Sequence, residues 1–157
     1  MKPITNLEEL IENLKGSEPK KLVVAAGQDE NTIEACHKAA TEKIAIVTLV
    51  GNKEKIDKLC VEKKLDRDVF EIIDEKDEIK AGTLARDMVR NKEGDCLMKG
   101  LIGTDKYMKL ILDKEQGLLT KGNVLSHITV IDSPFYQKTH KKLLFVGDVA
   151  IIPLPDL

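Results

Sequence analysis

Aromatic residues are scarce in this sequence: they make up 3% of its 157 positions, and tryptophan is absent. So few rings leave little surface on which nucleic-acid bases could stack. The formal net charge is only −2, so the chain as a whole does not attract polyanions. Both shortages argue against a nucleic-acid partner, and any anionic ligand must be held by local groups.

Long apolar runs are missing as well. A representative run, residues 44–50, is far too short to cross a bilayer. Charged residues stand near the N-terminus, where a signal peptide would need an apolar stretch. We therefore expect no membrane partner and a cytoplasmic location.

Cysteine is rare and never paired in a CxxC motif. Cys36, Cys60 and Cys96 are an odd, widely spaced set, which is typical of reduced structural thiols rather than disulfides or a zinc site. The three histidines form no HxxxH or HExxH pattern, so the sequence predicts no metal site.

What the sequence does contain is a regular alternation of strand-like and helix-like segments. Apolar runs predict strands at 21–27, 43–51, 70–73 and 96–98, and each is followed by apolar residues at helical spacing. Strands that are apolar on both faces and separated by helices are typical of an α/β fold. We expect a mostly parallel sheet with helices on both faces and ligands at the carboxyl ends of the strands.

The pattern changes after Gly117. Two further strands are expected at 124–131 and 142–148, and the residues between them leave no room for an ordinary crossover helix, so we expect antiparallel neighbours. We assign 1–132 to an α/β domain and 133–157 to the first part of a second domain that is truncated before completion. The apolar, proline-containing end at 151–157 would then be exposed, which predicts a homo-oligomer.

The stretch 95–111 carries the strongest chemical signal. A short strand breaks at Lys99-Gly100 and Gly103, and a helix follows, with Thr104 at the expected N-cap position. The unpaired N–H groups of the first helical turn, with Lys99 and Lys106 nearby, predict a small anion site suited to phosphate. Taken alone, the same residues are also explained by two turn glycines with positive φ and a capping threonine.

Several stretches together resemble the phosphate acetyl/butyryltransferase family, and its butyryl branch most closely. They are Val-Val-Ala-Ala-Gly at 23–27, Asp-Cys-Leu-Met-Lys-Gly-Leu-Ile-Gly-Thr at 95–104, Val-Leu-Ser-His at 124–127 and Leu-Leu-Phe-Val-Gly-Asp at 143–148. The Met-Lys-Gly turn and the Leu-Ser-His strand, at their mutual distance, are the most specific. The resemblance covers nearly the whole chain but only about the first half of a family member.

The resemblance implies a two-domain α/β fold similar to isocitrate and isopropylmalate dehydrogenases, with the active site in the cleft between domains. It implies reversible transfer of an acyl group between coenzyme A and inorganic phosphate, both of them substrates, with no tightly bound cofactor. The family's serine, arginine and aspartate near the carboxyl end have no counterpart here, so the chain alone is not implied to be active. Acetyl-specific members carry an arginine near His127, and its absence favours the butyryl branch.

Placed on this sequence, the resemblance suggests two groups of site residues. The phosphate- and CoA-binding group is Lys99, Gly100, Gly103 and Thr104, and the catalytic group, expected on the opposite side of the site, is Ser126, His127 and Asp148. Without the resemblance, Ser126 and His127 are an ordinary strand pair in which the histidine is satisfied by hydrogen bonds, and Asp148 caps the segment that follows it. A Ser-His-Asp hydrolase is disfavoured because adjacent strand residues point to opposite faces and no nucleophile elbow is present.

Two alternatives stay open. One is another acyl-phosphate enzyme of the same fold, including the acyltransferase that feeds phospholipid synthesis. The other is a non-catalytic phosphate- or nucleotide-binding α/β module, either receiver-like, with an acidic cluster after the first strands, or flavodoxin-like, with a flavin loop. The first strand is followed by Gly27-Gln28-Asp29, which is not such a cluster, and no GxGxxG motif follows any strand.

Overall fold

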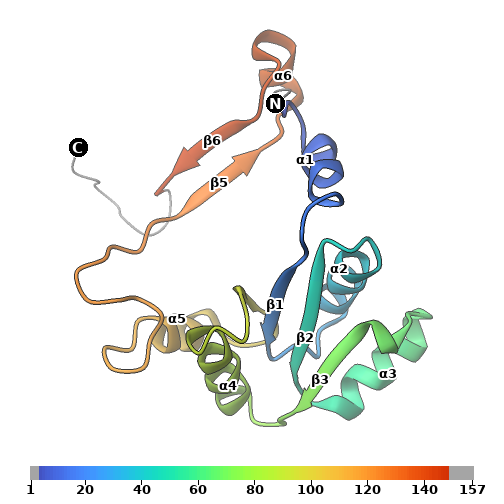
Figure 1. Cartoon of the computed structure of the whole chain (residues 1–157), viewed down its shortest axis with the longest axis vertical. Coiled ribbons are helices and arrows are strands. Elements are labelled where there is room, and N and C mark those ends of the chain that lie inside the picture. Colours follow the sequence, from blue (N-terminus) through green and yellow to red (C-terminus); the bar gives the residue numbers. More distant parts are fainter. Residues whose placement is uncertain (1–3, 149–157) are drawn as a thin grey trace. The chain divides into compact units, whose positions relative to one another are not determined.

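The computed structural model describes residues 4–148 (Figure 1). Contacts between residues divide the chain into two compact units, a larger one at Glu18–Lys121 and a smaller one formed by the segments before and after it. The expected domain boundary at 132/133 lies inside the smaller unit and stays a prediction.

The larger unit is built on a parallel sheet of four strands. They are β1 (Lys20–Ala25), β2 (Ala45–Gly51), β3 (Phe70–Asp74) and β4 (Cys96–Lys99), in the spatial order β3-β2-β1-β4. The register pairs Val23 of β1 with Thr48 of β2 and with Leu97 of β4. The sequence prediction of four parallel strands is confirmed.

Helices cover both faces of this sheet, as expected. They are α2 (Glu30–Thr41), α3 (Lys53–Lys63) and α4 (Glu78–Arg90), which link successive strands, and α5 (Thr104–Ile111), which follows β4; a 3-10 turn, η1 (Arg67–Val69), precedes β3. Side chains of α2 and α3 pack with Val24 and Leu49 in one core, whereas those of α4 pack with Val23 and Val50 in the other. Alternate strand residues therefore supply the two cores, as the pleat requires.

The strand order changes direction at β1, which has β2 on one side and β4 on the other. Chain connections run from β1 to β2 to β3 on one side, and α4 then carries the chain back so that β4 lies on the other side of β1. The segments that leave β1 and β4 therefore diverge at the carboxyl edge of the sheet. In open α/β sheets this is where ligands bind.

Three details of the larger unit differ from expectation. Helical spacing over 79–91 predicts that Leu84 faces the core with Ala81 and Ala85, but Leu84 is 38% exposed. Gly82 and Arg86 of α4 are buried instead. A Cβ on Gly82 would lie 2.6 Å from Leu110 and 2.8 Å from Ile102, so the glycine lets α5 and its preceding turn pack closely on α4. The sequence did not indicate that Gly82, a glycine inside a helix, marks a close contact between helices.

The third difference concerns the cysteines. Cys36 and Cys60 are buried, as expected, and burial raises the pKa of the Cys36 thiol to about 11. Cys96 is exposed, because β4 is an edge strand of the described sheet rather than a central one.

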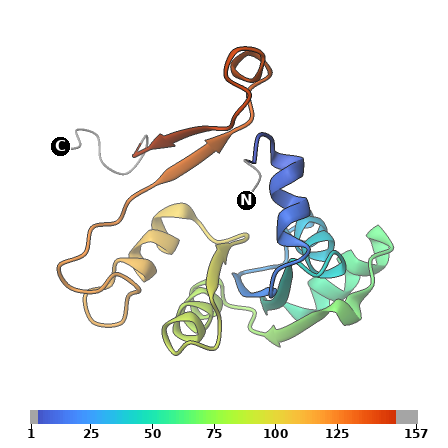
Figure 2. The ribbon, with the colours of Figure 1, turned by 45° about the horizontal axis from the view of Figure 1, so that its top comes forward.

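The smaller unit contains α1 (Leu7–Leu14), β5 (Ile128–Ile131), α6 (Pro134–His140) and β6 (Leu144–Gly147). Strands β5 and β6 pair antiparallel, which confirms the prediction, and Figure 2 shows them as an orange and red ribbon that continues into α6. The connection between them holds a helix of 7 residues, capped by Ser133 with Pro134 at its start. The sequence interpretation recognised that no crossover helix fits but missed this shorter one.

We expect Lys64→Gly to raise the free energy of unfolding by about 0.5–1 kcal/mol, because Lys64 ends α3 in the left-handed conformation at φ 55°. Chemical denaturation followed by circular dichroism measures the change.

The matched control is Lys58→Gly in the middle of the same helix, which should cost about 1 kcal/mol. Equal destabilisation by both variants would contradict the strain at Lys64.

Candidate functional site

The turn after β4 is held against the end of β1 by main-chain hydrogen bonds. The Gly100 amide donates to Ala25 O at 2.9 Å and the Leu101 amide to Ala26 O at 2.8 Å. A Cβ on Gly100 would lie 2.4 Å from Ala26 O and 2.9 Å from Ala25 O, so only glycine fits. Gly100 is therefore needed for lack of space and not for its backbone conformation. Among the described glycines only Gly122 has a positive φ, so the prediction that Gly100 and Gly103 are turn glycines with positive φ is wrong.

Thr104 does not cap α5, contrary to the sequence prediction. The N-cap is Gly103, which has no side chain to accept a hydrogen bond, and Thr104 is the first residue of the helix. Its side chain is exposed beside the turn. Only one residue separates the predicted and observed helix starts, but the change leaves the first-turn amides without a cap from their own chain segment.

A carboxylate from α4 binds beside these amides, at the main chain of the N-cap residue itself. Glu78 accepts a hydrogen bond from the Gly103 amide at 2.7 Å and pairs with the Lys106 ammonium at 3.0 Å. The Lys106 hydrogen bond, and then the Gly103 amide, hold the pKa of Glu78 below its usual range. The expected anion site at this helix N-terminus thus contains an internal anion, which sequence reasoning missed because 25 residues separate the partners.

Lys99 lies on the other side of the Gly100 turn, at the carboxyl end of β4. It is exposed, and its ammonium donates to the carbonyl of Gly100 at 3.3 Å. Hydrogen bonds from Thr32 lower the pKa of Asp29, the N-cap of α2, and the charge of Lys99 lowers it a little further. Lys99 and the start of α2 are therefore electrostatic neighbours at the switch between β1 and β4.

In the smaller unit, Asp148 brings the other two catalytic candidates together. One of its carboxylate oxygens accepts from the His127 amide at 3.0 Å, and the other accepts from the Ser126 hydroxyl at 3.2 Å. The Asp148 amide donates to His127 O at 2.7 Å, which places the residue directly after β6 with φ 51°. Ser126 and His127 precede β5, which begins at Ile128, so their expected position at the end of a strand is wrong.

The imidazole of His127 is directed elsewhere. Its Nε2 lies 3.4 Å from Thr129 Oγ1, and its buried Nδ1 has no hydrogen-bond partner among the described residues. Ser126 bonds to the carboxylate rather than to the histidine, so the three residues do not form the relay of a serine hydrolase. The Asp148 carboxylate therefore holds the hydroxyl of Ser126 and the main chain of His127, but not the imidazole.

Over residues 4–148, no group of three or more His, Cys, Asp or Glu side chains could hold a metal ion. No helix in that same range is long and apolar enough to span a bilayer.

Comparison with known proteins adds independent information. The family model described as phosphate acetyl/butaryl transferase matches residues 6–86. A phosphate butyryltransferase of Clostridium beijerinckii is 38% identical over 96% of this chain and 48% of its own length. A phosphate butyryltransferase of Clostridium acetobutylicum is 35% identical over 98% and 50%, and a phosphate acetyltransferase of Thermotoga maritima is 35% identical over 96% and 49%.

A solved structure supports the fold. A branched-chain phosphotransacylase from Enterococcus faecalis V583 superposes with a TM-score of 0.59 at 18% identity, over 84% of this chain and 43% of that one. The chain spans about half the length of the curated relatives it matches. The family model covers more than half of this chain, including three of the four strands of the parallel sheet, β1, β2 and β3, and so the chain belongs to the phosphate acetyl/butaryl transferase family.

Proposed function

We propose that this chain supplies one half of a phosphate acyltransferase, which moves a butyryl-type acyl group between coenzyme A and inorganic phosphate. The observation that carries the proposal is the turn 99–103, which places a lysine and a glycine-lined backbone at the switch point of a sheet that belongs to this family. The acyl-CoA and phosphate are the partners, and no tightly bound cofactor takes part.

The chemistry requires two anions to be held close together. A phosphate oxygen attacks the thioester carbonyl, a C–O bond forms, and the carbonyl carries a negative charge until the C–S bond breaks and coenzyme A leaves as a thiolate. Most of the acceleration comes from placing the phosphate and from donors aimed at the developing charge. In our proposal Lys99 supplies fixed positive charge to the phosphate, and Gly100, Gly103 and Thr104 form the surface it approaches.

Ser126, His127 and Asp148 are proposed to serve the reacting carbonyl and the leaving thiolate. The bond from Ser126 to Asp148 fixes the hydroxyl, and the imidazole of His127 is proposed to act as a hydrogen-bond donor or a general acid. An imidazole at this place, instead of the arginine of acetyl-specific members, is the basis for proposing a butyryl-type substrate.

Glu78 affects how phosphate reaches the turn. Its carboxylate already bonds the Gly103 amide and neutralises Lys106, so a phosphate there must displace it or bind on the Lys99 side. We propose the Lys99 side, because that ammonium donates only to a neighbouring carbonyl among the contacts of the described residues.

The protein is further proposed to act in the cytoplasm, where acyl-CoA and phosphate are available, and to assemble as a homo-oligomer. The apolar side chains exposed in the smaller unit support assembly: Phe145 is 66% exposed and Phe135 84%.

The proposed acyl transfer can be tested directly. Thiol release from butyryl-CoA should depend on phosphate when this chain is extended by the second half of a relative, and should be absent with the chain alone. Release without phosphate would indicate a hydrolase. Phosphate binding by the chain, with no release by either protein, would favour the non-catalytic binding module.

The proposed phosphate-binding residues can be tested by substitution. Lys99→Ala should weaken phosphate binding to the chain about fivefold, since a charge-assisted hydrogen bond is lost at an exposed position. Thr104→Val should weaken it less, and Lys109→Ala, on the same helix as Thr104, is the control that should leave it unchanged. Phosphorus NMR titration measures the affinities, and equal values for Lys99→Ala and Lys109→Ala would remove Lys99 from the site.

The role of the internal anion, Glu78, can be tested in the same titration. Glu78→Gln removes the charge that neutralises Lys106 and competes for the Gly103 amide, so phosphate affinity should rise about threefold or more. Glu75→Gln, an acidic residue just before α4, is the control. A fall in affinity with Glu78→Gln would show that Glu78 supports the phosphate site instead of competing with it.

A further inference from the structure

The larger unit contains a pocket of about 510 Å³ that the proposed reaction does not use. The last turn of α4 forms one side of it, and the loop that follows α5 forms the other. All its lining residues lie within 89–121, so the pocket belongs to this unit alone.

The pocket lies at the amino-terminal edge of the sheet. The segment after α4 meets the start of β1, where the Asp95 amide donates to Lys21 O at 2.8 Å. Lys92 also lines a neighbouring pocket of about 410 Å³ together with Lys20 and Lys21 of β1. The Lys99 turn stands at the opposite, carboxyl edge, so the two sites are separate.

One wall of the pocket is a rigid turn. The Asp113 carboxylate accepts from the Gln116 amide at 2.7 Å and the Glu115 amide at 2.9 Å, and these bonds, in that order, lower its pKa. The Leu118 amide donates to Ile111 O at 2.9 Å and closes the loop. A Cβ on Gly117 would lie 2.3 Å from Asp113 O, so this turn closes only with glycine. The wall is therefore formed before any ligand arrives.

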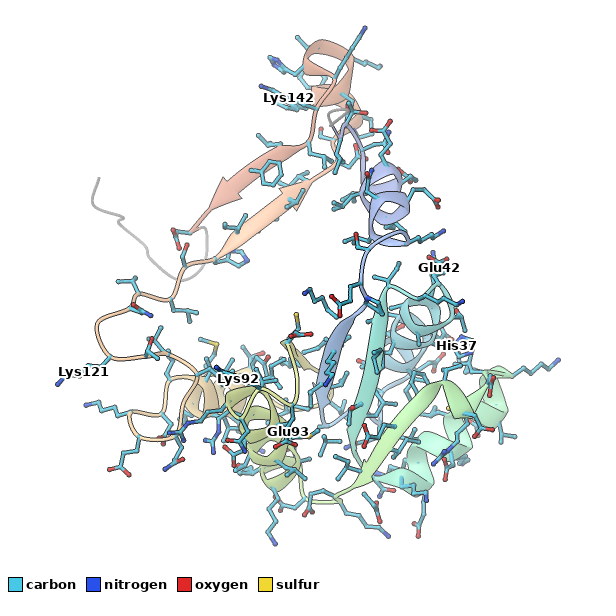
Figure 3. The ribbon with its side chains drawn as sticks, viewed as in Figure 1. His37, Glu42, Lys92, Glu93, Lys121 and Lys142 are labelled. Atoms are coloured by element: carbon cyan, nitrogen blue, oxygen red, sulfur yellow. The ribbon has the colours of Figure 1, made fainter. Side chains whose placement is uncertain are left out.

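The lining combines positive charge with apolar surface. Its charged residues are Arg90, Lys92, Lys114 and Lys121 against a single carboxylate, Glu115, and the cations come from both walls. Figure 3 labels Lys92 after α4 and Lys121 at the end of the loop. The apolar part of the lining consists of Val89, Leu118 and Leu119, which are half-buried.

We propose that this pocket binds an organic anion that carries at least two negative charges and an apolar group. Arg90 donates to the side chain of Gln116, and together with the three lysines of the lining it can neutralise a phosphate monoester, whereas a neutral apolar compound would offer these charges no counter-ion. The half-buried aliphatic side chains bind the apolar group, and inorganic phosphate lacks that contact. The assignment does not depend on the acyl-transfer reaction.

The probe for this pocket is phenyl phosphate, compared with inorganic phosphate and phenol, in a titration of the 157-residue chain followed by amide NMR shifts. Phenyl phosphate should shift the amides of Gly117, Leu118 and Leu119 and bind about fivefold more tightly there than inorganic phosphate or phenol. Shifts confined to Gly100, Gly103 and Thr104 would report the turn after β4 and overturn the pocket proposal. Shifts confined to the pocket would support the pocket proposal, even if the acyl-transfer experiment gave a negative result.

Charge removal provides the matched test. Lys92→Gln with Lys114→Gln should weaken phenyl phosphate binding at the pocket about fivefold or more, and added salt should reduce the difference. The control is Lys53→Gln with Lys55→Gln in the first turn of α3, which removes the same charge from residues that do not line the pocket. This control should change the affinity less than about twofold. Equal weakening by the two double variants would show attraction to net charge alone and would overturn the proposal.

Discussion

No side chain fits between the end of β1 and the turn after β4. Two main-chain hydrogen bonds draw Gly100 and Leu101 onto the carbonyls of Ala25 and Ala26, and the space left beside Gly100 is smaller than a methyl group. This contact fixes where β4 ends, and with it the positions of Lys99 and of the start of α5. The candidate phosphate site is thus positioned by main-chain packing, which side-chain mobility cannot loosen.

Around this contact, the starts of helices are satisfied by carboxylates of the protein itself. Asp29 caps α2 and Asp77 caps α4, and Glu78 reaches from α4 to the first amide before α5. A free phosphate competes with such groups for the same N–H donors. Selectivity for phosphate at this edge therefore depends on cations that the carboxylates leave available, and Lys99 has that role in our proposal.

Most of the larger unit could be predicted from the sequence, because its signals are local. Apolar runs such as 45–51 are strands whichever neighbours they have, and Asn52 or Asp77 before a helical pattern marks the helix start. The sequence also indicated where the turn of the site lies. It could not show the pairing of Glu78 with Gly103, the close packing at Gly82 or the carboxylate bonds of Asp148, because each joins residues far apart in the chain. Such contacts exist only once the chain has folded.

The exposure of Cys96 gives the protein an intrinsic chemical handle. Thiolates react and thiols do not, and burial keeps Cys36 and Cys60 protonated and out of reach of reagents. At neutral pH a maleimide should therefore attach first to Cys96, which lies on the same edge strand as Lys99. Cys96 is the first residue of that strand, so a fluorophore placed there, in a chain without tryptophan, would report on events near the amino-terminal edge of the sheet with no mutation required.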